Sequence, residues 1–267
     1  MERENFEKTK KEKKFNENQL EGRNAILEAL KNGREIDKIF IRKGNTDGTL
    51  KKIVAMATDK GIVVQKIPPE KMDFMSQTKN HQGIIAYVSV HQYAEVADIL
   101  NSAKEKGEDP FIIILDEITD THNLGAIIRS AEASGVHGII IPKRRSAGLN
   151  ATVGKTSAGA VEYVPVAKVT NLASTIEDLK KEGLWIACAD ADGENYFESN
   201  LKGPIAVVIG NEGDGVSRLI KEKCDFIISI PMFGKISSLN ASVAGGLIMY
   251  EIVRQRKFSR LRHKIQA

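Results

Sequence analysis

The sequence predicts an α/β protein whose C-terminal part is a parallel sheet covered by helices. After Pro110, near-continuous runs of Ile and Val recur at 111–115, 138–142, 184–189, 205–209 and 226–230. Such runs are typical of strands that are buried on both faces, and the helix-like segments between them are typical of βαβ units. Ligands of such sheets bind beyond the carboxyl ends of the strands. The loops after these five strands are therefore the expected places for chemistry.

A smaller α/β unit is expected before this sheet, in residues 19–90. Its predicted elements are two helices and three strands, at 22–33, 36–42, 50–61, 62–67 and 84–90, with a Pro-Pro turn before the last strand. Residues 1–18 mix Lys and Arg with Glu and have few apolar side chains, so we expect a disordered charged arm. The polar segment 91–109 is expected to be a linker, which leaves 110–267 for the sheet domain.

Composition narrows the class of protein. The 267 residues are 42% hydrophobic and 28% charged, as in a soluble globular protein. No run approaches the roughly 20 apolar residues that span a bilayer, and the first residues form no secretory signal. Cys188 and Cys224 lack the spacing of a metal site or a disulfide framework. We therefore expect two reduced thiols in a cytoplasmic protein with no metal and no membrane contact.

The placement of charge favours a polyanionic partner. The formal net charge is +4, and from Ile252 onward there are six Lys or Arg and no acidic residue. A second basic cluster at 142–145 follows a predicted strand. Basic groups at strand ends and in the C-terminal segment suit RNA, although a basic tail can also serve solubility alone.

The loop after residue 115 leads into a helix without the glycine pattern GxGxxG. A dinucleotide-binding enzyme or an ordinary class I methyltransferase would have that pattern here, so both are disfavoured. Asn123 stands where the helix is expected to begin, and it suits either an N-cap or a functional side chain. Arg129 is predicted roughly opposite the apolar stripe of this helix, either as an ordinary exposed arginine or as a functional one.

The loop after residue 209 reads "GNEGDGVS" and has three glycines in six residues. Glycines at the end of a buried strand allow a ligand to approach the backbone closely. The acidic residues Glu212 and Asp214 would repel phosphate, and no Lys-Ser or Lys-Thr follows, so a P-loop is excluded. An uncharged or cationic ligand fits this loop better.

The loop after residue 230 reads "PMFGKISSLN" and precedes an apolar helix. Ser238 and Asn240 both stand before that helix, but a helix start needs only one capping residue. The other polar side chain is therefore a candidate for the site.

Three segments, "NLGAIIRSAEASG", "VVIGNEGDGVS" and "IPMFGKISSLNASVA", resemble in order and spacing the three motifs of the SPOUT superfamily of RNA methyltransferases, in its SpoU/TrmH branch. The resemblance runs from about Gly22 to Arg256, and "EGRNAILEAL" is similar to the start of that branch's substrate-binding domain. Within the branch, the sequence is most similar to enzymes that 2'-O-methylate a guanosine of 23S ribosomal RNA.

The resemblance implies a SPOUT domain with a deep trefoil knot, preceded by a small α/β domain like ribosomal protein L30e. Nothing in the hydrophobic pattern indicates a knot. The family is homodimeric, with S-adenosyl-L-methionine as its cofactor and sites near the dimer interface. By resemblance, the expected cofactor-binding residues are Gly210, Asn211, Ile230, Met232 and Leu239.

The same resemblance implies a catalytic set formed by Asn123, Arg129, Glu212, Ser238 and Asn240. The reaction would be attack of a ribose 2'-hydroxyl on the methyl group of the cofactor. Arg129 is the family's suspected base, but a guanidinium keeps its proton at neutral pH. A second role is that it holds the phosphate beside the target ribose.

Two other functions stay open. A tRNA guanosine 2'-O-methyltransferase of the same branch would share the site, although relatives that act on tRNA generally lack the N-terminal domain. A non-catalytic RNA-binding assembly factor would share the fold. The sequence keeps the polar residues of all three motifs, which favours an enzyme that acts on ribosomal RNA.

Overall fold

The computed structural model describes residues 18–44 and 47–258. The charged arm predicted at 1–18 lies outside the described residues except for Asn18, as does most of the basic C-terminal segment. The chain divides into two compact units at residues 1–88 and 89–267.

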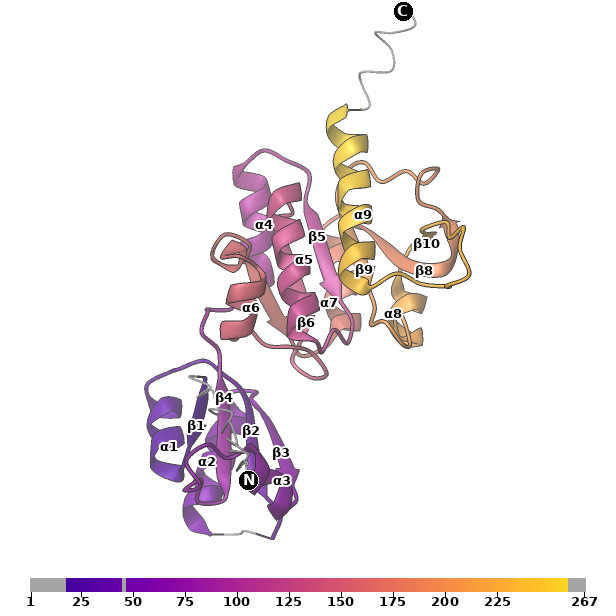
Figure 1. Cartoon of the computed structure of the whole chain (residues 1–267). Coiled ribbons are helices and arrows are strands. Elements are labelled where there is room, and N and C mark those ends of the chain that lie inside the picture. Colours follow the sequence, from indigo (N-terminus) through magenta and orange to yellow (C-terminus); the bar gives the residue numbers. More distant parts are fainter. Residues whose placement is uncertain (1–17, 45–46, 259–267) are drawn as a thin grey trace, which may run out of the picture. The chain divides into compact units, whose positions relative to one another are not determined.

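The first unit is a four-stranded sheet with three helices (Figure 1). Its elements are β1 Gln19–Glu21, α1 Arg23–Lys31, β2 Ile36–Arg42, α2 Gly48–Asp59, β3 Val63–Ile67, α3 Pro69–Met75 and β4 Ile84–Val88. The strand order is β1-β4-β2-β3. β2 and β3 are parallel, while β4 is antiparallel to β1 and β2.

The predicted elements of this unit are confirmed, and two more are present. The short strand β1 pairs with β4. Helix α3 forms where a Pro-Pro turn was expected, because Pro69 stands at the first helical position, where a missing N–H costs nothing. Met72 of α3 is fully buried in a small cluster with Ile67 and Ile85.

The second unit contains a six-stranded sheet in which every strand pair is parallel. Its order is β10-β8-β9-β5-β6-β7. The strands are β5 Phe111–Leu115, β6 Gly138–Pro142, β7 Val166–Val169, β8 Trp185–Asn195, β9 Ile205–Ile209 and β10 Phe226–Ser229. The five predicted strands are confirmed. The sixth, β7, was missed because it has only four residues and includes Lys168.

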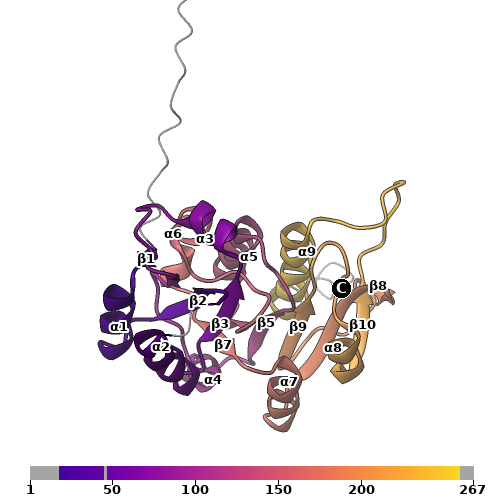
Figure 2. The same cartoon turned by 90° about the horizontal axis from the view of Figure 1, so that it is seen from below.

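Helices cover both faces of this sheet, as the view from below in Figure 2 shows. The helices are α4 Val96–Glu105, α5 Thr121–Ser134, α6 Ala151–Thr156, α7 Leu172–Lys181, α8 Arg218–Lys223 and α9 Ala241–Val253. A 3-10 turn at Ala160–Glu162 and a π-helical turn at Arg254–Phe258 complete the unit. The cores place α5, α6 and α9 on one face and α4, α7 and α8 on the other.

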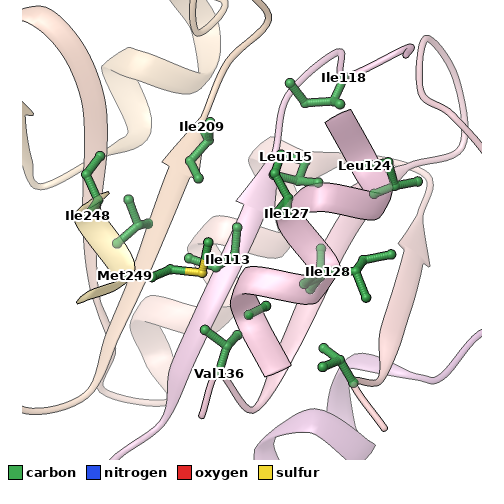
Figure 3. Close-up of a cluster of buried hydrophobic side chains, with 14 of the residues drawn as sticks. Ile113, Leu115, Ile118, Leu124, Ile127, Ile128, Val136, Ile209, Ile248 and Met249 are labelled. Carbon is green, nitrogen blue, oxygen red and sulfur yellow. The ribbon is translucent and has the colours of Figure 1, made fainter. Parts of the chain in front are cut away.

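Alternate residues of the central strand β5 supply the two cores. Ile113 and Leu115 pack toward α5 and α9 (Figure 3), where Ile127 and Met249 are also buried. Ile112 and Ile114 belong to the opposite cluster. Burial of both side-chain rows is why the strands read as continuous apolar runs rather than alternating ones.

The segment 91–109 is not a bare linker, which corrects the sequence prediction. It contains helix α4, whose Ile99 and Ala103 are fully buried. Ala94 forms a parallel bridge with Ala167. The segment reads as polar because α4 buries only a narrow stripe, and it belongs to the second compact unit.

The ends of β5, β8, β9 and β10 meet at one edge of the sheet, because these strands are parallel neighbours. The pairing of β8 with β10 is interrupted there. Ile227 pairs with Cys188, whereas the next residue, Ile228, pairs with Glu194. Residues 189–193 of β8 are therefore displaced from the ladder with β10.

Candidate functional site

A cavity of about 560 Å³ opens at this edge of the sheet, within the volume range of small-molecule sites. Four stretches of chain line it, and each lies at or after the carboxyl end of a strand that was predicted from the sequence. The lining residues lie within 189–191, 209–215, 228–232 and 237–248. The lining contains no Lys, Arg or His among the described residues. The cavity therefore does not suit a phosphate-bearing ligand.

The glycine-rich loop after β9 is a tight turn. Asn211 and Gly215 pair across it through backbone hydrogen bonds of 3.2 and 3.1 Å. The Asn211 side-chain Oδ1 accepts from the backbone N–H groups of Gly213 and Asp214, both at 2.8 Å. A Cβ on Gly210 would lie 2.0 Å from the Gly215 carbonyl carbon. Only glycine fits there without moving the backbone, so this loop keeps its backbone open to the cavity.

The side chain of Asn240 makes two separate sets of hydrogen bonds, one through its oxygen and one through its nitrogen. Its Oδ1 accepts from Ser242 N–H and Val243 N–H at 3.0 and 3.4 Å, which makes it the N-cap of α9. Its Nδ2 donates to Asn123 Oδ1 at 3.0 Å and to Glu212. Asn240 is therefore both the expected cap and part of a polar cluster, so the two roles do not fall to different residues.

Asn123 completes this cluster, which we call the Asn-Glu-Asn cluster: Asn123, Glu212 and Asn240. The Asn123 Nδ2 donates to Glu212 Oε1 at 3.0 Å. The structure excludes Asn123 as the N-cap, because α5 begins at Thr121 and Asp120 accepts from His122 N–H. Asn123 thus stands in the first turn of α5, with its side chain free to reach the glycine-rich loop.

Two predicted site residues stay outside this cluster. Ser238 lines the cavity and is exposed. Arg129 is exposed on α5, six residues beyond Asn123, and does not line the cavity. Within the part of the chain that the structure describes, no hydrogen bond or ion pair engages Arg129, so it can meet a partner that binds from outside.

The five residues expected to hold a cofactor all line the cavity: Gly210, Asn211, Ile230, Met232 and Leu239. Gly210 is buried, Ile230 and Leu239 are half-buried, and Met232 is 38% exposed. They supply backbone groups and apolar walls. Their role in binding stays a prediction.

Sequence reasoning missed two carboxylates near the cavity. Asp116, which is buried, accepts from Ser217 N–H at 2.8 Å and so fixes the far end of the glycine-rich loop. Asp190 lines the cavity and pairs with Lys221. The sequence predicted strands that end at residues 115 and 189. Asp116 and Asp190 directly follow these two predicted strand ends, and this position could have indicated both carboxylates.

Comparison with known proteins identifies the family. Residues 110–250 match the family model described as SpoU rRNA Methylase family. The chain belongs to the SpoU rRNA methylase family. Residues 19–94 match a second model, described as RNA 2'-O ribose methyltransferase substrate binding. The two matches correspond to the sheet unit and the small N-terminal unit.

Relatives and solved structures agree with this family. A Bacillus subtilis (strain 168) protein assigned to the TrmH family of tRNA/rRNA methyltransferases, YacO, is 49% identical over 88% of this chain and 94% of its own length. The SpoU methyltransferase AviRb of Streptomyces viridochromogenes, in complex with the cofactor AdoMet, aligns with a TM-score of 0.55. That alignment covers 93% of this chain and 91% of AviRb at 22% identity, which shows the fold alone.

A third comparison covers a smaller share of the chain. The A. aeolicus TrmH/SpoU tRNA modifying enzyme aligns with a TM-score of 0.52 at 31% identity. The alignment covers 58% of this chain and 79% of that enzyme. The family model and the relatives therefore include proteins described for both rRNA and tRNA.

Among residues 18–44 and 47–258, no group of three or more His, Cys, Asp or Glu side chains could hold a metal ion. Over the same residues, no helix has the length and apolar character needed to cross a membrane.

Proposed function

We propose that the protein is an S-adenosyl-L-methionine-dependent RNA methyltransferase that methylates the ribose 2'-hydroxyl of a guanosine in 23S ribosomal RNA. The observation that carries the proposal is the cavity beside the Asn-Glu-Asn cluster, in a chain of the SpoU family. The proposed location is the cytoplasm, where such RNA is found.

The residues of the cavity fit the cofactor. Its adenine ring and the methylene groups of its methionine chain need apolar walls, which Ile230, Met232 and Leu239 provide. Its polar groups can reach backbone groups of the loop at Gly210 and Asn211. The lack of lining cations suits a ligand without phosphate and with a positive sulfonium. When bound, the cofactor supplies an already activated methyl group.

The chain's own residues then have to align the RNA hydroxyl, and the proton that this hydroxyl loses as it takes the methyl group passes to solvent water. Alignment supplies much of the acceleration, because the leaving group is already activated. Glu212 is held by two amide donors, Asn123 and Asn240, so its carboxylate has a fixed position beside the cavity. We assign to this cluster the orientation of the reacting ribose, with Ser238 as a further hydrogen-bonding group. Arg129 holds the neighbouring phosphate bidentately.

The small N-terminal unit supports ribosomal RNA as the substrate. It matches the substrate-binding model over residues 19–94, whereas the aligned tRNA modifying enzyme covers 58% of this chain. We further propose that this unit has the fold of ribosomal protein L30e, that the sheet unit contains a trefoil knot, and that the protein is a homodimer. The return of the chain from the edge strand β10 to α9, which packs on α5 on the same face of the sheet, supports the knot.

The deciding experiment uses the purified protein with tritiated S-adenosyl-L-methionine. Unmodified large-subunit rRNA and unmodified tRNA are offered separately, and the products are digested to nucleosides. We expect label in 2'-O-methylguanosine from rRNA only.

Label from tRNA alone would replace the proposal with the tRNA enzyme, which the A. aeolicus likeness favours as second candidate. Absence of label with either substrate, together with measurable RNA binding, would overturn the enzymatic proposal.

A further inference from the structure

One side chain of the cavity has no place in the function proposed above. Asp190 follows the point where β8 leaves its ladder with β10, and it lines the cavity with Ala189 and Ala191. The displaced segment is held closely. A Cβ on Gly193 would come within 2.6 Å of the backbone at Ile227 and Ile228. The position of Asp190 is therefore set by backbone packing as well as by its side-chain partners.

Lys221 of α8 fixes the Asp190 carboxylate. Its Nζ lies 3.1 Å from Asp190 Oδ2 and 3.4 Å from Asp192 Oδ2. The hydrogen bond to Asp190 raises the pKa of Lys221 above its ordinary value, so the lysine stays charged. The side chains of Asp190 and Lys221 are 20% and 25% exposed, while that of Asp192 is 84% exposed. Asp190 is thus the carboxylate of this pair that faces the cavity.

The other acids of the lining differ from Asp190. Glu212 is engaged by Asn123 and Asn240, and Asp214 is exposed. Asp190 Oδ2 lies 3.8 Å from the place where a Gly215 side chain would begin. Its carboxylate therefore lies beside the glycine-rich loop, in the lining of the cavity. Lys221 offsets its charge, which leaves a fixed acceptor for neutral donors rather than a strong attractor of cations.

Paired hydroxyl groups are the neutral donors that a nucleoside ligand brings. Carboxylates placed at strand ends bind the ribose hydroxyls in other nucleotide sites. We propose that Asp190 accepts hydrogen bonds from the ribose hydroxyls of S-adenosyl-L-methionine and that Lys221 is the positioning residue of this contact. The inference rests on the proposed cofactor of the same cavity.

Calorimetric binding tests this contact without any RNA or turnover. The ligands are S-adenosylhomocysteine and its 2'-deoxy and 3'-deoxy counterparts. A hydrogen bond to a charged group contributes about 1.5–3 kcal/mol, so we expect the wild-type protein to bind at least one deoxy compound about 10-fold or more weakly. In Asp190→Ala, affinity for S-adenosylhomocysteine should fall by about 10-fold or more, and the preference for the ribose compound should shrink below about 3-fold.

Two further variants separate position from charge. Lys221→Met keeps the carboxylate but frees it, so we expect a smaller loss of affinity and a reduced preference for ribose. Asp192→Ala is the matched control, because Asp192 also contacts Lys221 but does not line the cavity. Its affinity should stay within about twofold of wild type, since exposed ion pairs contribute little.

The outcomes distinguish this inference from the proposed function. If the wild-type protein binds no S-adenosylhomocysteine, the proposed function fails. If it binds that ligand and both deoxy compounds equally well, the ribose contact is overturned while the function stands, whether or not Asp190→Ala folds. Loss of affinity in Asp190→Ala with an unchanged preference for ribose would also overturn it.

Discussion

At the scale of single residues, the site depends on amide side chains that have two tasks. The oxygen of Asn240 caps α9, and its nitrogen joins the Asn-Glu-Asn cluster. Capping could be predicted from the sequence, because it depends on neighbours two and three residues away. The hydrophobic pattern could not show the cluster, because its hydrogen bonds join residues 89 and 117 positions apart. Only the resemblance to the SpoU/TrmH branch grouped Asn123, Glu212 and Asn240, and it gave no hydrogen bonds between them.

Substitution at Asn240 separates these two tasks. Asn240→Ser keeps a good N-cap but removes the amide donor, so we expect methyl transfer to fall at least about 10-fold with a melting temperature near wild type. Asn240→Ala removes both and should also lose about 1 kcal/mol of stability. Thermal melts and initial rates measured on the same preparations check this. Equal activity of Asn240→Ser and wild type would remove the cluster from the mechanism.

Arg129 is the residue whose role is most open to a chemical test. As a phosphate clamp, Arg129→Ala should lower kcat/KM on RNA by about 100-fold, through loss of two charge-assisted hydrogen bonds. The melting temperature and cofactor affinity should not change, because the side chain is exposed and lies outside the cavity. Lys181→Ala, which removes an exposed cation at the end of α7, is the control.

Arg129→Lys distinguishes the clamp from a base. A lysine keeps the charge but not the planar fork, so a clamp predicts a partial loss at every pH. A base predicts activity that climbs toward the wild-type rate as the pH rises, because an ammonium loses its proton far more readily than a guanidinium.

At the scale of elements, the long apolar strands follow from the sequence, whereas helix α4 and the short strands β1 and β7 do not. Apolar runs such as 111–115 can be recognised as strands in the sequence because the side chains on both faces of the strand are buried. Helix α4 and strand β7 were missed because each buries few residues, and their polar members hide the pattern. The glycine-rich loop was located correctly, but the reason for its glycines is steric and appears only when Gly210 is seen against Gly215.

Two glycines of this loop form a matched pair for experiment. In Gly210→Ala, the new Cβ would collide with the backbone of Gly215 and Val216 at 2.0–2.2 Å. We expect a loss of about 1–3 kcal/mol of stability and a cofactor affinity reduced at least about 10-fold. In Gly213→Ala, the nearest atom is Asn211 Oδ1 at 3.5 Å, an ordinary contact. That variant should melt and bind like wild type, and similar behaviour of both variants would refute the steric explanation.

At the scale of the whole molecule, two compact units correspond to the two family matches. The sequence predicted units at 19–90 and 110–267 with a linker between them, whereas the structure divides the chain after Val88 and includes 91–109 in the second unit. The basic residues of the C-terminal segment were interpreted as suiting RNA, with solubility as the alternative. Arg256 turns out to have a different task, because its guanidinium donates to the backbone carbonyls of Asp109, Pro110 and Gly203.

Truncation after Arg256 therefore tests the basic segment while keeping these contacts. It removes four Lys or Arg, at 257, 260, 262 and 264. If each neutralises a phosphate, the slope of log affinity for RNA against log salt should become shallower by up to roughly 3. Affinity measured from low to moderate salt, for both forms of the protein, decides this. An unchanged slope would mean that the segment does not contact RNA.

The residues that line the cavity all lie within 189–248. The cavity is therefore completed late during synthesis of the chain. Chains are made from the amino terminus, and N-terminal units fold first. The segment that matches the substrate-binding model, 19–94, is complete well before α9 supplies the last wall. A product stalled before Ala241 would therefore contain the segment that matches the substrate-binding model but would lack α9, one wall of the proposed cofactor cavity. On the proposed function, we expect premature termination to yield a competitor of the full-length protein for RNA rather than a weaker catalyst.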